Sequence, residues 1–157
     1  MNPTKLDSID LQILEQLQLN SNITNAALAE EVGLSPAPTL ERVRKLEQAG
    51  YISGYHAELA YDKLGLNTGV FVLISLSQHK KKDILSFVEK IKAIPEIIEC
   101  YHITGQADFL IKILTEDLAS YQKIIMDKLA DIEQIGTMSS MMILNTYKKM
   151  KNIPLKK

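Results

Sequence analysis

Residues 33–47 read GLSPAPTLERVRKLE, and this stretch predicts the beginning of an amphipathic helix. Ser35 is a favoured N-cap residue, and Pro36 follows at the first helical position, where proline is tolerated. Gly50 supplies the stop signal at the other end. We therefore expect a helix that starts after Ser35 and ends before Gly50.

The predicted helix has an apolar face and a polar face. At 100° per residue, Leu40, Val43 and Leu46 share one face, which we expect to be buried. Arg42 and Arg44 flank the opposite face and are the only arginines in the chain. The planar fork of donors of an arginine suits phosphates and guanine edges. The residues expected on the outward side itself are Ala37, Pro38, Glu41 and Lys45.

Two further helices are predicted before this one. The first begins after the N-cap residue Asp7 and ends at residues 20–22, and the second begins after Thr24 and ends at Gly33. So short a junction between the second and third helices is typical of a helix-turn-helix. Residues 51–57 predict a small β-hairpin, or wing. A plain three-helix packing domain is the alternative interpretation of the same pattern.

The second half of the chain alternates strands and helices in the order of a ferredoxin-like βαββαβ domain. The predicted fold class is therefore α+β, with an N-terminal winged helix-turn-helix followed by this domain. Helices on one sheet face leave the other face free, and dimerisation would cover it. The expected elements are strand 70–76, helix 82–94, strands 97–104 and 108–115, helix 118–129 and strand 136–147.

Composition narrows the classes of protein that the chain can represent. Its 157 residues are 46% hydrophobic and 24% charged, and the net charge is −1. The longest apolar run is too short for a membrane span, and residues 1–5 lack a secretory signal, so we expect a cytoplasmic protein with no membrane partner. A single cysteine, Cys100, excludes an intrachain disulfide framework and suits that compartment. Residues 1–67 carry five basic and nine acidic side chains, a net charge of −4, which disfavours strong DNA binding by one isolated copy.

The motifs at residues 6–10, 33–47 and 50–55 resemble the Lrp/AsnC family of feast/famine transcription regulators. The resemblance runs over nearly the whole chain and implies a sequence-specific DNA-binding regulator that responds to a small amino acid. It implies a winged helix-turn-helix domain at 6–67, with the helix-turn-helix at 25–44. A dimerising amino-acid-sensing domain at 68–151 would assemble further into a tetramer of dimers or an octamer. The expected DNA-contacting residues are Ser35, Ala37, Pro38, Thr39, Glu41, Arg42, Arg44 and Lys45.

The same resemblance implies an effector site between dimers, around the loop between the second and third strands and along the last strand. Many family members carry an acidic residue where this chain has Gln106, whereas the acidic position at Asp108 is kept. A carboxylate there is suited to the amino group of an amino acid. Methionines on the last strand favour leucine or methionine as effector, with core filling as the alternative. The expected effector-binding residues are Gly105, Gln106, Ala107, Asp108, Ser139, Ser140 and Met141.

No catalytic residues, cofactor or metal site are expected. Siroheme decarboxylases resemble this architecture and provide an enzyme alternative, and an interaction module that has lost DNA binding is a third possibility. Cys100 and His102 share a strand face, and with His56 or His79 they could be taken for a metal site. Their spacing matches no diagnostic ligand pattern, so a packed thiol beside an incidental histidine is the preferred interpretation.

Overall fold

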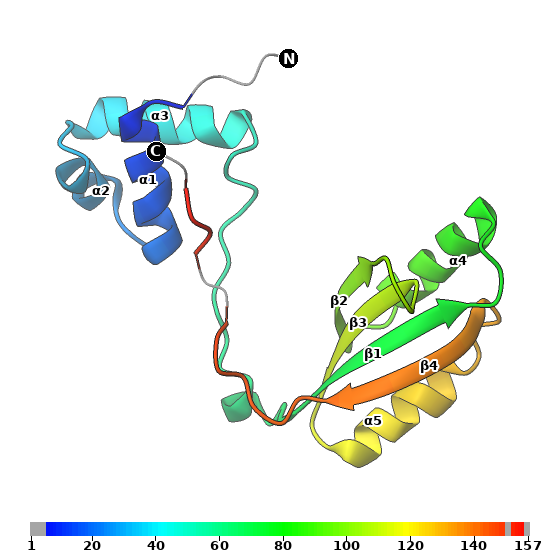
Figure 1. Cartoon of the computed structure of the whole chain (residues 1–157). Helices are drawn as coiled ribbons and strands as arrows, with labels where there is room; N and C mark the ends of the chain where they lie inside the picture. Colours follow the sequence, from blue (N-terminus) through cyan, green and yellow to red (C-terminus); the bar gives the residue numbers. More distant parts are fainter. Residues whose placement is uncertain (1–5, 150–151, 156–157) are drawn as a thin grey trace. The chain divides into compact units, whose positions relative to one another are not determined.

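The computed structural model describes residues 6–149 and 152–155, and the chain divides into two compact units (Figure 1). The first unit contains the described residues up to Glu58 and those from Tyr147 onward, and the second is Leu59–Thr146. The expected domains, 6–67 and 68–151, differ from this division in two places: residues 59–67 belong to the second unit, and the C-terminal segment from Tyr147 onward belongs to the first. No helix in the described part of the chain is long and apolar enough to cross a membrane.

Three helices build the first unit, close to where the sequence predicts them. They are α1 (Ser8–Leu19), α2 (Asn25–Glu31) and α3 (Pro36–Gln48). The N-caps Asp7 and Thr24 accept backbone N–H bonds from the first turns of their helices. The buried hydrophobic residues at the centre of the unit are Ile13, Leu14, Leu28, Val32 and Leu46.

The buried face of α3 is rotated from the one predicted. Leu46 is buried and Val43 packs against the core, but the Leu40 side chain is 39% exposed. Thr39 occupies the inward position instead and has no exposed surface. Its hydroxyl donates to the Ser35 carbonyl one turn earlier, at 3.0 Å, so burial leaves no polar atom unsatisfied.

The predicted hairpin at residues 51–57 does not form, since no strand is present from residue 51 to residue 60. The N–H groups of Tyr51 and Ile52 both donate to the carbonyl of Leu46, at 3.0 and 3.4 Å. These donors therefore close the end of α3 and are unavailable to a hairpin ladder. The Tyr55 hydroxyl donates to Oε1 of Glu47 at 2.9 Å and holds this extended segment to α3.

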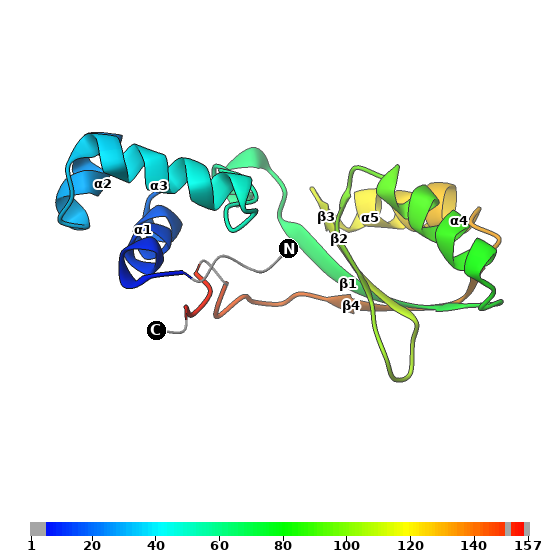
Figure 2. The same ribbon diagram turned by 90° about the horizontal axis from the view of Figure 1, so that it is seen from above.

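The second unit is a four-stranded antiparallel sheet in the order β2-β3-β1-β4, as a ferredoxin-like domain requires. Figure 2 shows both helices of the unit on one face of this sheet. Alternate residues of β1 and β3 point to that face and form the core together with Phe87 and Leu129. After a short helical turn, η1 (Asp62–Leu64), the elements are β1 (Thr68–Leu76), α4 (Lys81–Lys92), β2 (Ile97–His102), β3 (Phe109–Thr115), α5 (Leu118–Ile124) with its wider continuation η2 (Ile125–Leu129), and β4 (Ile135–Met142).

The last strand ends earlier than the predicted limit of residue 147. Met142 pairs with Val70, and the N–H of Ile143 still donates to the Gly69 carbonyl at 2.9 Å. Strand β1 begins at Thr68, so β4 has almost no further backbone to pair with. The chain then leaves the sheet and continues toward the C-terminal segment.

The C-terminal segment, residues 147–149 and 152–155, belongs to the first unit and runs beside α1 (Figure 1). The N–H of Ile153 donates to Oε1 of Gln18 at 2.7 Å, and Nε2 of Gln18 donates back to the Ile153 carbonyl at 3.4 Å. Leu155 packs against the core of the unit, and Lys149 pairs with Glu58 at 3.1 Å. The helical core is therefore partly covered by the end of the chain.

Leu155→Ala is expected to destabilise the first unit by about 1 kcal/mol, because it removes partly buried apolar surface. Leu144→Ala is the matched control, since that leucine is 95% exposed and should contribute almost nothing. Urea denaturation followed by circular dichroism would measure both. Equal effects of the two substitutions would mean that Leu155 does not pack against the helical core in solution.

Candidate DNA-binding surface and effector site

Helices α2 and α3 are joined by a tight turn at Gly33. This glycine has φ of 68°, a left-handed conformation that other residues adopt only with strain. The N–H of Leu34 donates to the Ala29 carbonyl at 2.9 Å, which ends α2. Asn25 donates from Nδ2 to the Pro36 carbonyl at 2.8 Å and thereby ties the start of α2 to the start of α3. The turn is therefore fixed at both ends, as a helix-turn-helix requires.

Most of the residues expected to contact DNA lie on the exposed side of α3. Thr39 differs, because its buried side chain has no surface to offer a ligand. Ser35 forms the N-cap but makes no side-chain capping bond, and so its exposed hydroxyl is not committed to the helix. The remaining exposed residues of the expected set are Ala37, Pro38, Glu41, Arg44 and Lys45.

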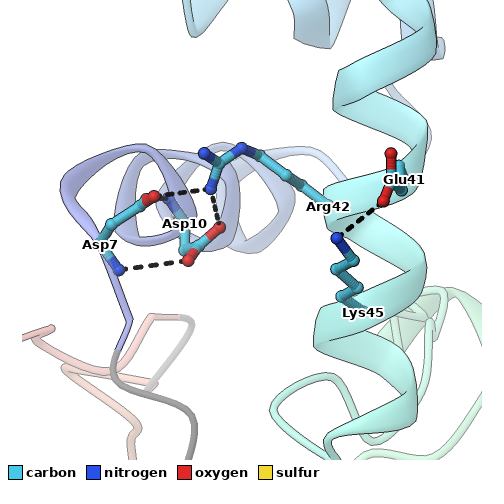
Figure 3. Close-up of polar contacts among 5 residues, drawn as sticks. All are labelled: Asp7, Asp10, Glu41, Arg42 and Lys45. Carbon is cyan, nitrogen blue, oxygen red and sulfur yellow. Dashed lines mark hydrogen bonds and ion pairs between the residues drawn. The ribbon is translucent and has the colours of Figure 1, made fainter.

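Arg42 points toward α1 (Figure 3). Its terminal nitrogen Nη1 lies 2.7 Å from Oδ2 of Asp7 and 2.7 Å from Oδ1 of Asp10. The pKa of the Asp7 carboxyl is lowered, chiefly by the N–H of Asp10 and next by Arg42, and the two carboxylates raise the pKa of Arg42. Sequence spacing did not indicate this contact, which spans more than 30 residues.

The other two cations of α3 differ in their partners. Lys45 pairs with Glu41 one turn earlier, at 2.7 Å, and this pairing lowers the pKa of the Glu41 carboxyl (Figure 3). Arg44 is exposed and makes no hydrogen bond or ion pair with another described residue. Within the described part of α3, Arg44 is therefore the cation whose charge is not already compensated by a carboxylate.

Tyr55 and Glu47 fix the chain that leaves α3. Burial, followed by the Glu47 carboxylate, raises the pKa of the Tyr55 hydroxyl to about 12. The hydroxyl therefore remains a protonated donor to Glu47 at neutral pH. This bond links the segment after α3 back to the helix, in the region where the sequence predicted a hairpin.

In the second unit, Asp108 ends the loop between β2 and β3. Its Oδ2 accepts the N–H of Leu76 at 2.7 Å, and Nε2 of His79 lies 3.0 Å from both carboxylate oxygens. The Leu76 N–H is the main cause of the lowered pKa of the Asp108 carboxyl, and His79 adds to it. From the sequence, we expected this carboxylate to bind the amino group of an amino acid. In the structure it already accepts hydrogen bonds from within the chain, and its side chain is 23% exposed.

The rest of the loop between β2 and β3 also lies beside the C-terminal end of β1. Gly105 has φ of 124°, which favours glycine, and the N–H of Ile103 donates to the Asp108 carbonyl at 2.8 Å. The Gln106 carbonyl lies 3.5 Å from the Ser75 hydroxyl. The loop residues Gly105, Gln106 and Ala107 thus form a compact turn that is closed by Asp108.

Strand alternation separates the expected effector residues of β4. Ser139 pairs with Leu73 and Met141 with Phe71, on the face that the helices do not cover. Ser140 lies on the opposite face, where its hydroxyl forms a hydrogen bond with the hydroxyl of Tyr121. The three residues therefore cannot line one pocket on one side of the sheet.

The histidines and Cys100 do not gather into a metal site. Among the described residues, no three side chains of histidine, cysteine, aspartate or glutamate come together in an arrangement that could hold an ion. His102 stacks on Phe109 with ring centroids 4.7 Å apart, and His79 contacts Asp108.

Comparison with known proteins matches both units to described families. Residues 6–53 match winged helix-turn-helix DNA-binding domains, and residues 69–153 match the Lrp/AsnC ligand binding domain. A DNA-binding unit joined to a ligand-binding α+β unit defines a transcriptional regulator. The chain belongs to the Lrp/AsnC family of such regulators.

Individual relatives agree with this assignment. The chain is 37% identical to a leucine-responsive regulatory protein of Rhizobium meliloti over 92% of both chains, and 34% identical to the transcriptional regulator AzlB of Bacillus subtilis over 96% of both. It is also similar to the crystal structure of a Neisseria meningitidis transcriptional regulator in complex with L-Met. That similarity has a TM-score of 0.91 and 30% identity, and covers 96% of this chain and 97% of the other. These names are those of regulators rather than enzymes, so the siroheme decarboxylase alternative is set aside.

The lowered pKa of Asp108 predicts an acid-sensitive contribution to stability. A carboxyl whose pKa is lower in the folded chain stabilises the fold above its ordinary pKa of 3.8, and this contribution is lost as the pH falls below that value. Asp108→Asn should therefore be less stable than the unmodified chain at pH 7, and the difference should shrink at pH 3. Urea denaturation at both pH values tests this, with the exposed Asp131→Asn as control. A difference that stays constant with pH would contradict the proposed charge effect.

Proposed function

We propose that this regulator binds DNA through the exposed side of α3, with Arg44 as its principal cation. The observation that supports this is the uncompensated charge of Arg44 on the second helix of a helix-turn-helix, the helix that enters the major groove in such motifs. Ser35, Ala37, Pro38, Glu41 and Lys45 lie on the same helix within reach of the groove. Thr39 takes no part, because its side chain is buried.

The unit of DNA binding is a homodimer that assembles further. The uncovered sheet face supports this proposal, because it presents Phe71, Leu73 and Leu110 beside the exposed side chain of Tyr101. The same face also carries the ion pair of Lys112 with Glu99. A sheet face that is otherwise largely apolar is normally covered by another layer. A second copy supplies that layer and a second α3. A tetramer of dimers, or octamer, is the larger assembly that we propose.

The effector is an amino acid, with leucine or methionine favoured. The complex of the similar Neisseria regulator with L-Met supports this choice, as does the ligand-binding family of residues 69–153. We place the site at the loop 105–108 and along β4, the strand at the edge of the sheet, beyond the layer that the second copy supplies, with Ser139 and Met141 as its strand residues. Asp108 acts chiefly by holding the loop to Leu76. Backbone groups of the loop then face the ligand, and the Asp108 carboxylate can accept a further hydrogen bond from it.

An effector between dimers changes DNA affinity by favouring one arrangement of the assembly over another. Such coupling is typically worth about 1–3 kcal/mol. We assign the protein to the cytoplasm, where its DNA and its amino acids are both available.

Arg44→Ala should weaken binding to a preferred duplex about tenfold and lower the slope of log affinity against log salt by roughly 0.9 for each lost phosphate contact. The duplex is one that the full-length chain selects from a random-sequence library, and fluorescence anisotropy measures the binding. Lys63→Ala removes the same charge from the turn η1 and is the control. If both substitutions weaken binding alike, Arg44 contributes only to net charge.

Asp108→Ala should abolish binding of the amino acid and leave DNA affinity unchanged, because the loop 105–108 loses its bond to Leu76. Isothermal titration calorimetry with L-methionine and with L-leucine measures the first effect, and anisotropy measures the second. Asp131→Ala should bind the amino acid as the unmodified chain does. Normal ligand binding by Asp108→Ala would place the effector site elsewhere.

A further inference from the structure

The N-cap of α1 and Arg42 form a closed hydrogen-bond network. Oδ1 of Asp7 accepts the N–H of Asp10 at 2.8 Å, and Oδ2 of Asp10 accepts the N–H of Asp7 at 3.2 Å. The other oxygen of each carboxylate lies 2.7 Å from Nη1 of Arg42. Each of the four carboxylate oxygens therefore has one hydrogen-bond partner, and a single guanidinium nitrogen bridges two residues of α1 (Figure 3).

The charge of this network makes Arg42 a poor contact for DNA. Two carboxylates face one guanidinium, so the group as a whole carries a net charge of −1. The Arg42 side chain is only 31% exposed, and Figure 3 shows it extended toward α1 rather than along the side that carries Glu41 and Lys45. A phosphate would meet a local surplus of negative charge here, whereas at Arg44 it would meet an uncompensated cation.

Because of its position along α3, Arg42 affects how the exposed side chains of this helix are oriented. It lies between Glu41 and Arg44 in the sequence, near the middle of the helix. The apolar contacts of Val43 and Leu46 hold α3 to the core but are non-directional. The two charge-assisted hydrogen bonds that Nη1 of Arg42 donates are directional, and they restrict how the helix is rotated and where it lies along its axis.

We propose that Arg42 is a positioning residue for DNA recognition: bridged to Asp7 and Asp10, it sets the orientation of α3 against α1 and thereby determines which α3 side chains meet the bases. This inference rests on the proposed DNA-binding role of α3. It also means that Asp7 and Asp10 contribute to sequence specificity although they do not contact DNA.

The test compares specific with non-specific binding in the full-length chain. The specific probe is the duplex that the unmodified chain selects from a random-sequence library, and the non-specific probe is a scrambled duplex of the same composition. The variants are Arg42→Ala, Asp10→Asn and the two combined, with Arg44→Ala for comparison. Circular dichroism melting establishes that each is folded. Arg42→Lys, which keeps the charge on a shorter side chain that does not reach both carboxylates, is used if the alanine variant does not fold.

Arg42→Ala and Asp10→Asn should each lower the ratio of specific to non-specific affinity about tenfold, and the combined variant should be no worse than Arg42→Ala. The salt dependence should stay unchanged in these variants but fall in Arg44→Ala. Arg42→Lys should also lower the ratio.

Two results would overturn the inference while leaving the proposed function intact. In the first, Arg42→Ala weakens binding to both duplexes by the same factor and reduces the salt dependence as Arg44→Ala does. That result would make Arg42 a direct phosphate contact. Folded Arg42 variants with an unchanged ratio would leave the network a purely structural role. If the unmodified chain selects no preferred duplex, the proposed function itself fails, and this inference fails with it.

Discussion

The bridge from Arg42 to Asp7 and Asp10 is the interaction on which the arrangement of the DNA-binding unit depends. The carboxylates that bind the guanidinium also cap α1, so the first turn of α1 and the middle of α3 cannot shift independently. The bond from Asn25 to Pro36 fixes the start of α3 in the same way. With α3 held at both places, the outward direction of Arg44 follows from helix geometry alone.

Local signals in the sequence were sufficient to locate the helices and strands. Asp7, Thr24 and Ser35 each precede a helix, because a capping residue acts within one turn of itself. The inward face of α3 was harder to predict. Residues 39, 43 and 46 lie within about 60° of arc on a helix and residues 40, 43 and 46 within about 120°, but hydrophobicity favoured Leu40 over Thr39. The hydroxyl bond to Ser35 removes the cost of burying Thr39, and residue type alone does not reveal it.

Sequence spacing does not reveal contacts between site residues that are distant along the chain. Arg42 appeared to be a DNA contact because its partners lie in another helix, and nothing near it in the sequence indicates them. His79 was likewise not associated with Asp108, since the strands and the loop that bring them together are distant in sequence. The separation of Ser140 from Ser139 and Met141, by contrast, follows from the two-residue period of any strand and was available from the sequence.

Most cations of α3 are paired with carboxylates, so the DNA affinity of the protein depends on how many copies associate. Arg42 and Lys45 are paired with carboxylates, so one copy of α3 offers a single uncompensated cation. DNA affinity grows with the number of phosphates neutralised, so one copy is a weak binder. In the homodimer that we propose, copies joined through the uncovered sheet face, with Phe71 among its apolar residues, bind with high effective concentration. We infer that assembly supplies the affinity that the single helix lacks, which makes DNA binding sensitive to any ligand that alters the assembly.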